Sequence, residues 1–332
     1  MLRFFDGFET NSYATWTTHS IGGGGPSISS QGRFGGSALS IYSATVSNVV
    51  GSQSCWTVGF ALQSSNQSTQ GAFMVLVDGS TTQIQLEFST SGSTLLVRNG
   101  NGTILGTVAT SGDLNVWHYY ELQVVFSATV GSVILKRDGA TLLTLTNVNT
   151  ISSANASADT LSFTTGFGCT VLVDDIYMCD TSETINNTFL GDCRVTLWVP
   201  TQDGAHKDFT PSAGTSHYAM VDDMPSDGDA TYVSSGTVGA IDTYRAPMAT
   251  FAGTVKGLRV GITARKDDAG DRSVGIVIGD GVDPVTQIGG NIALTTVYTR
   301  QTTPIMEINP LTGSPWTLAD IQADEFGLEV TV

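Results

Sequence analysis

The stretch HYYELQVVFSATVGSVILKRDGATLLTL, residues 118–145, decides the fold class. Tyr120, Leu122, Val124 and Phe126 alternate with other residues, which is the period of a strand with one buried face. The pair Asp138-Gly139 follows the next apolar run and favours a tight hairpin turn, because both residues adopt a positive φ readily. More leucines follow the turn, so the stretch predicts antiparallel β structure.

The same alternation recurs along the chain, at residues 56–62, 193–199, 258–264, 274–278 and 326–332. Asp78-Gly79 and Asn99-Gly100 are further hairpin signals, and the turn at 267–270 joins two strands. One short helix is expected at Thr317–Ala323, with Thr317 as its cap. Many short strands with regular turns predict an all-β protein built from β-sandwich or jelly-roll domains.

The chain has 332 residues, whereas one domain usually holds about 100–200. Only 13% of the residues are charged, too few to cover the wet faces of long helices. A polar run at 180–187 follows an apolar strand and precedes a new one. We therefore predict two domains, residues 1–182 and residues 183–332.

The charge distribution excludes some classes of partner. The net charge is −16; residues 1–180 hold 5 basic and 11 acidic residues (−6), and residues 181–332 hold 9 and 19 (−10). Neither half has the positive face that phosphate binding requires, so no nucleic-acid partner is predicted. No apolar run approaches the roughly 18 residues of a membrane span, and none near the N-terminus fits a secretion signal. We expect no membrane insertion, folding in a cytoplasm, and four cysteines that remain thiols.

Candidate metal ligands occur in the acidic run at 222–229. Calcium takes six to eight oxygen ligands, and Asp222, Asp223, Asp227 and Asp229 could supply several of them. The alternative is a solvated acidic turn without a bound ion. No other cofactor is predicted.

Signs of catalysis are missing from the sequence. No strand carries acidic residues at alternate positions, as paired-carboxylate glycan hydrolysis would need, and no G-x-S-x-G motif occurs. The prediction is therefore a protein that is not an enzyme. Trp16, Trp117 and Trp198 could stack on sugar rings, with burial in a core or a subunit contact as the alternative.

Several segments resemble known families. FDGFE at 5–9, GRFGGSAL at 32–39 and VDDIYMCD at 173–180 resemble a laminin-G/concanavalin A-like jelly roll as it occurs in phage proteins. NTFLGDCRV at 187–195 and ARKDDAG at 264–270 are similar to segments of tailed-bacteriophage virion proteins. The resemblance implies a laminin-G-like first domain, followed by a C-terminal β-sandwich-like virion domain.

The function implied by this resemblance is that of a virion structural protein, made in the host bacterial cytoplasm. The expected role is a fibre or tail appendage subunit that presents a lectin-like domain to a host-surface glycan and contacts other virion proteins. One alternative is a head decoration or cement protein. The alternative from another class is a glycan-degrading enzyme on a concanavalin A-like fold. Low charge density and Ser/Thr-rich strand faces further predict a homo-oligomer, with a trimer favoured for a fibre.

Overall fold

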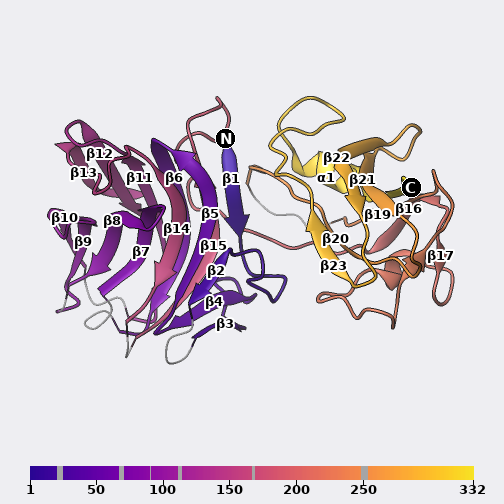
Figure 1. Cartoon of the computed structure of the whole chain (residues 1–332), viewed down its shortest axis with the longest axis horizontal. Helices are drawn as coiled ribbons and strands as arrows, with labels where there is room; N and C mark the ends of the chain where they lie inside the picture. The colour runs from indigo at the N-terminus through magenta and orange to yellow at the C-terminus, as the bar shows by residue number, and fades with distance from the viewer. Residues whose placement is uncertain (21–24, 67–70, 90, 111–113, 167–168, 248–252) are drawn as a thin grey trace. The chain divides into compact units, whose positions relative to one another are not determined.

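A computed structural model describes residues 1–20, 25–66, 71–89, 91–110, 114–166, 169–247 and 253–332 (Figure 1). The all-β fold class is confirmed, since nearly every described element is a strand. The chain forms two compact units, Met1–Thr196 and Leu197–Val332. The division falls later than the predicted boundary at residue 182, because residues 187–196 hydrogen-bond to the first unit.

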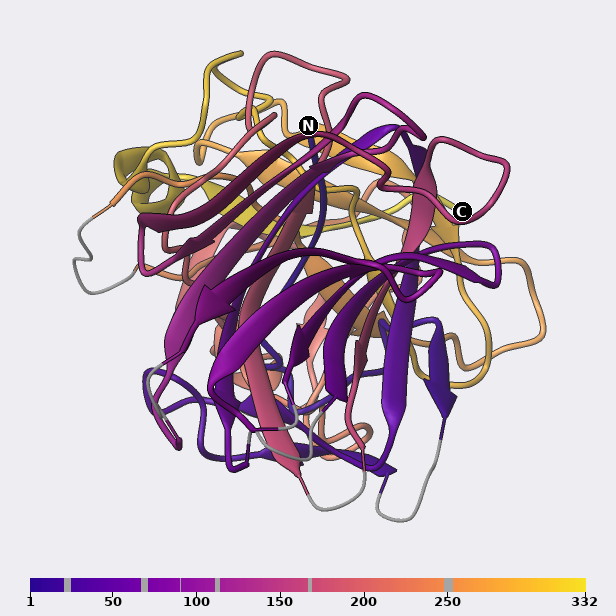
Figure 2. The same cartoon turned by 90° about the vertical axis from the view of Figure 1, so that its left-hand side faces the viewer.

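The first unit is a jelly roll of two antiparallel sheets. Sheet A has the order β13 (Ala140–Val148), β12 (Gly131–Arg137), β11 (His118–Val125), β6 (Cys55–Ser64), β15 (Thr170–Cys179), β4 (Ala38–Tyr42) and β3 (Gly25–Ser29), and β1 (Leu2–Asp6) also pairs with β15. Sheet B has the order β10 (Ile104–Ala109), β9 (Thr94–Asn99), β8 (Thr81–Phe88), β7 (Gly71–Asp78), β14 (Ala158–Thr164), β5 (Thr45–Gln53) and β2 (Thr18–Ser20). Figure 2, turned by 90° from the view of Figure 1, shows these strands as twisted ribbons.

The hydrophobic core lies between the two sheets. The alternating residues Trp56, Val58, Phe60 and Leu62 are all buried there, as the sequence predicts. Aromatic rings fill much of the space, with the Phe60 ring 5.1 Å from that of Phe163. The two sheets therefore each present one face to the core and one outward.

The turns follow their sequence signals closely. Asp138 and Gly139 have φ values of 51° and 80° and join β12 to β13 as a hairpin, which confirms the prediction. The hairpins at Asp78-Gly79 and Asn99-Gly100 are confirmed as well. The strand predicted at 193–199 is wrong: these residues have no strand pairing. Within this segment, the Val195 N–H donates instead to a side chain of the first unit, Asp175.

The second unit is built on a five-stranded sheet with the order β16 (Gln202–Lys207), β19 (Ile241–Arg245), β24 (Glu325–Val330), β21 (Ser273–Gly279) and β22 (Thr286–Ala293). Two small ribbons join β17 (Thr210–Pro211) to β18 (Val233–Ser234) and β20 (Gly261–Ala264) to β23 (Thr299–Thr302). The unit also has the 3-10 turn η1 (Tyr218–Met220) and the helix α1 (Leu318–Ala323). Thr317 caps α1 in a capping box with Asp320, which confirms that prediction. No helix in the described part of the chain is long and apolar enough to cross a bilayer.

Candidate functional site

The outer face of sheet B carries a row of hydrogen-bonding side chains. The core uses one side of each strand, so the flanking residues point the other way. Strand register places Ser47 beside Ser162, Ser162 beside Val75, Val75 beside Gln85, and Gln85 beside Arg98. We name as the polar face this row and its neighbours: Thr45, Ser47, Val75, Gln85, Glu87, Arg98, Ser162 and Thr164.

Hydroxyl pairs organise one half of the polar face. The Oγ atoms of Ser47 and Ser162 are 2.8 Å apart, and the Oγ1 atoms of Thr45 and Thr164 are also 2.8 Å apart. In each pair one hydroxyl donates to the other. Because a hydroxyl has one donor and two acceptor positions, each pair keeps capacity for a further polar ligand.

A charge pair organises the other half. Arg98 Nε donates to Glu87 Oε2 at 2.7 Å, and Gln85 Nε2 donates to the same oxygen at 3.3 Å. Arg98 also donates from Nη1 to the carbonyl of Gly102 at 3.0 Å. These contacts hold a guanidinium, a carboxylate and an amide in fixed positions, and the charges of Arg98 and Glu87 compensate each other.

Exposure varies across the outer face of sheet B. Val75 is 9% exposed and Ser162 is 5% exposed, although both point away from the core. Towards the two ends of the sheet, Val49 and Ile104 are 57% and 48% exposed. The middle of the face is therefore more enclosed than its ends.

Part of the outer face of sheet A, on β11 and β15, is covered. Residues 187–196, which we name the strap, lie over it and hydrogen-bond to side chains of β11 and β15. Glu121 and Tyr177 are each 2% exposed beneath the strap. Burial, and then the neighbouring Glu121, raise the pKa of Tyr177 far above its usual value. The strap therefore closes the part of this face around Glu121 and Tyr177 to ligands.

A buried polar network occupies the second unit. His217 Nδ1 lies 2.9 Å and 3.0 Å from the two carboxylate oxygens of Asp242, and Tyr244 Oη donates to Asp242 Oδ2 at 2.7 Å. Burial and then the Asp242 charge raise the pKa of Tyr244 well above its usual value. The network connects His217, which precedes η1, to Asp242 and Tyr244 on β19. These hydrogen bonds stabilise the second unit.

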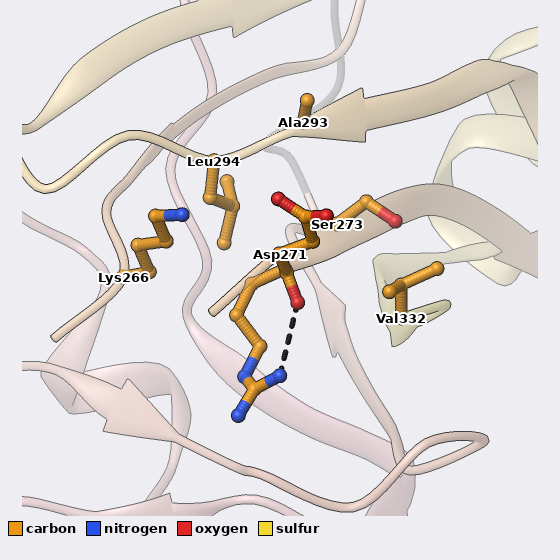
Figure 3. Close-up of a pocket in the computed structure, with 7 residues that line it drawn as sticks. Lys266, Asp271, Ser273, Ala293, Leu294 and Val332 are labelled. Carbon is orange, nitrogen blue, oxygen red and sulfur yellow. Dashed lines mark hydrogen bonds between the residues drawn. The ribbon is translucent and has the colours of Figure 1, made fainter. Parts of the chain in front are cut away.

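The second unit has a surface cavity of about 340 Å³. Figure 3 shows it in close-up. Its lining consists of Lys266, Asp271, Arg272, Ser273, Ala293, Leu294 and Val332. The charged groups are engaged within their own turn: Lys266 Nζ donates to the carbonyl of Gly270, and Arg272 Nη2 donates to Asp268 at 2.6 Å. The dashed bond in Figure 3 runs from Arg272 Nη1 to the Asp271 carbonyl at 2.9 Å. The polar atoms of this cavity thus stabilise the turn at 267–271.

The predicted calcium ligands form hydrogen bonds with different partners. Asp223 and Asp227 both accept from Thr231 Oγ1, at 3.3 Å and 2.9 Å. Asp229 instead accepts from Arg265 Nη2 at 2.9 Å and from Tyr298 Oη at 2.8 Å. Within the described ranges, no group of three or more His, Cys, Asp or Glu side chains is placed to hold a metal ion. Calcium at Asp222, Asp223, Asp227 and Asp229 stays a prediction, and the contacts fit the solvated turn better.

The three predicted glycan-contact tryptophans differ in position. Trp16 is corrected: it is 2% exposed in the core, where its Nε1 donates to Asp6 at 3.1 Å. Its large apolar ring packs at 5.3 Å from that of Phe4, out of reach of a sugar. Trp198 is partly buried against the core of the second unit, and Trp117 is half-buried just before β11.

Comparison with known proteins gives similarity of fold only. No family model and no curated protein matches the chain. One matching structure is an endo-β-1,4-glucuronan lyase from Trichoderma reesei (15% identity, TM-score 0.43, 54% of this chain and 95% of that one). The cellulose-induced protein Cip1 matches at 14% identity and a TM-score of 0.44, over 53% of this chain and 96% of that one. Domain 4 of a Geobacillus stearothermophilus arabinanase, solved with arabinotriose, matches at 14% identity and a TM-score of 0.38. The match covers 53% of this chain and 91% of that one.

These matches correct the function predicted from the sequence. The prediction of a virion fibre or tail appendage subunit is contradicted, because the matching structures include glycan lyases and an arabinanase domain. The similarity of the short segments to phage proteins and the predicted self-association stay predictions.

Proposed function

We propose that the protein acts on polysaccharides and that its first unit contacts the glycan chain through the polar face. The observation that carries this proposal is the row of hydrogen-bonding groups on β5, β14, β8 and β9, which point away from the core. A glycan presents many hydroxyl groups, each of which donates and accepts. Hydroxyl, amide, carboxylate and guanidinium groups at fixed positions are suitable partners for such a ligand.

The charge of the polar face favours an uncharged glycan. Arg98 is compensated by Glu87 at 2.7 Å, so the face offers no surplus positive charge to an acidic sugar. Residues 1–180 as a whole carry a net charge of −6, from 5 basic and 11 acidic residues. An anionic polysaccharide would be repelled by this balance, and the repulsion would weaken with added salt.

Cleavage of the bound chain is the second candidate function. It is favoured by Glu87, a carboxylate placed to take up a proton, because Arg98 beside it would then lose its counter-charge and neutralise an acid group of the substrate. Hydrolysis by two opposed carboxylates is not favoured, because within the polar face Glu87 is the single acidic residue. Cleavage therefore requires an acidic substrate, whereas the first candidate function is binding of a neutral chain. The charge of the polysaccharide distinguishes the two.

The test measures binding by affinity electrophoresis against neutral and acidic polysaccharides. We expect retardation by a neutral glycan that decreases several-fold in Gln85→Ala. A matched control is Gln123→Ala, which removes the same group from the outer face of sheet A. Retention of full binding by Gln85→Ala, or equal loss in the control, would exclude the polar face. Release of shorter chains from an acidic polysaccharide, abolished in Glu87→Gln, would favour cleavage.

A further inference from the structure

The strap is held by ionisable groups rather than by strand pairing. Gly191 N–H donates to Glu121 Oε1 at 2.9 Å, and Leu190 N–H donates to Tyr177 Oη at 3.0 Å. Further along, Val195 N–H donates to Asp175 Oδ1 at 2.8 Å. Three backbone donors of the strap are thus bound by side chains whose acceptor strength depends on their surroundings.

Arginine side chains form further contacts that hold the strap. The guanidinium of Arg33 donates from Nη1 and Nη2 to the two oxygens of Asp192, each at 2.5 Å. The ring centroid of Phe34 is 4.9 Å from the guanidinium carbon of Arg33 and 4.6 Å from that of Arg194 in the strap. The strap is therefore attached at both of its halves.

Two adjacent carboxylates lie at the centre of this attachment. Asp174 and Asp175 are 3% and 2% exposed, and the backbone of Asp175 has a φ of 51°. Asp174 Oδ2 accepts from the Arg33 amide at 2.9 Å. Asp175 Oδ2 is buried and accepts no hydrogen bond, although Arg33 Nη1 lies 3.7 Å away. A proton on this oxygen would leave the Val195 bond to Oδ1 intact.

We propose that the strap is a pH-sensitive latch, which the protonated Asp174–Asp175 pair holds closed and which loosens when both carboxylates are ionised. Two ionised carboxylates on consecutive buried residues repel each other and lack water. Release of the strap would hydrate both charges and lengthen the free connection between the two units. It would also uncover Glu121 and Tyr177 on sheet A.

The surroundings of Asp174 and Asp175 favour the protonated form of both carboxyl groups. Burial, and then the Asp175 charge, raise the pKa of Asp174 to about 7, and burial raises the pKa of Asp175 to about 6. The other charged or titratable groups facing the pair are Arg33, Arg194, Asp192, Glu9 and Tyr119. Arg33 and Arg194 lower the pKa of Asp175, but burial outweighs them. The latched state therefore binds the proton more tightly than the released state, in which water reaches the carboxylates.

The test is hydrogen–deuterium exchange of the full chain, read in peptides covering 187–196 and corrected for the intrinsic pH dependence of exchange. For a carboxyl with the shifted pKa of Asp175, protection should fall about tenfold between about pH 5 and about pH 8. Peptides from β6 in the core report global opening, and their protection should stay above that of the strap at every pH, because release of the strap comes before global unfolding. A strap whose protection is independent of pH in the unaltered protein overturns the proposal.

The matched variant is Asp175→Asn, which keeps the acceptor for Val195 and tolerates a positive φ, but cannot ionise. Its strap protection should change about tenfold less between the two pH values than that of the unaltered protein, because only Asp174 still ionises. A pH slope that persists undiminished in this variant would exclude Asp175 as the sensing group. Asp138→Asn, which alters an acid that faces His118 instead, should keep the slope of the unaltered protein.

Discussion

Arg98 and Glu87 form a charge pair on the outer face of sheet B, with Arg98 Nε 2.7 Å from Glu87 Oε2. The pair crosses neighbouring strands, since Glu87 lies on β8 and Arg98 on β9. Their mutual compensation gives the polar face hydrogen-bonding capacity without a net charge. The proposal of a neutral glycan ligand depends on this relationship.

Close packing of sheet A under the strap predicts a strong effect of Gly59→Ala. A Cβ at this position would lie 2.0 Å from Cε1 of the buried Tyr177 ring. We expect a loss of about 1–3 kcal/mol in the free energy of unfolding, because the ring has no room to move. Urea unfolding followed by circular dichroism measures it. Gly236→Ala is the control, since nothing lies within 4 Å of its Cβ, and should change stability by less than about 0.5 kcal/mol.

Trp16→Phe tests whether this tryptophan is a core residue. The substitution removes the indole donor to the buried Asp6 and leaves a space beside Phe4 and Phe163. We expect a loss of about 1–3 kcal/mol in the free energy of unfolding and no change in glycan binding. Trp117→Phe, at a half-buried site, should cost clearly less stability. Equal costs for the two variants would contradict the assignment.

Fragments of the chain test where the first unit ends. Residues 1–196 include the strap, whereas residues 1–182 leave Glu121, Tyr177 and Asp175 without its backbone donors. The shorter fragment should melt at least about 5 °C below the longer one, because buried polar groups lose their partners. Differential scanning calorimetry decides this. Identical melting temperatures would place the end of the unit at the polar run near residue 182.

Stability should depend on pH through Asp175. Its pKa is raised to about 6 in the folded protein from 3.8, so the folded state binds the proton more tightly than the unfolded state. The stabilisation is present at low pH and is lost as pH rises through about 6. Between about pH 4 and about pH 8, the unaltered protein should lose about 2 kcal/mol relative to Asp175→Asn. Parallel urea-unfolding curves at each pH measure the difference, and a constant offset between the two proteins would contradict it.

The sequence predicts local structure better than it predicts the site. Alternation at 56–62 and the Asp138-Gly139 turn identify strands and hairpins because side-chain period and positive φ are local properties. Residues 193–199, which overlap the strap, show the limit: Cys193, Val195 and Leu197 have the period of a strand, but this segment does not pair with another strand. Their partners, such as Asp175, come from elsewhere in the chain and have no signature in the sequence of the strap.

The polar face was missed for a related reason. Its signal is present, since Thr45 and Ser47 flank Val46, and Ser162 and Thr164 flank Phe163. Serines and threonines on a strand are common on any wet face, so the pattern alone indicates no ligand. Only the strand register brings Ser47, Ser162, Gln85 and Arg98 into one row. The tryptophans drew attention as sugar-stacking candidates, yet Trp16 fills the core.

The most direct test of the central claim is to map a bound oligosaccharide on the full chain by amide chemical shifts. The ligand is taken from the neutral polysaccharide that retards the protein most strongly. We predict that the perturbed amides cluster on β5, β14, β7, β8 and β9, around Ser47, Ser162 and Gln85, and that Gln85→Ala reduces the perturbations throughout this cluster. Perturbations confined to the second unit or to sheet A, with the polar face unchanged at saturation, would contradict the account.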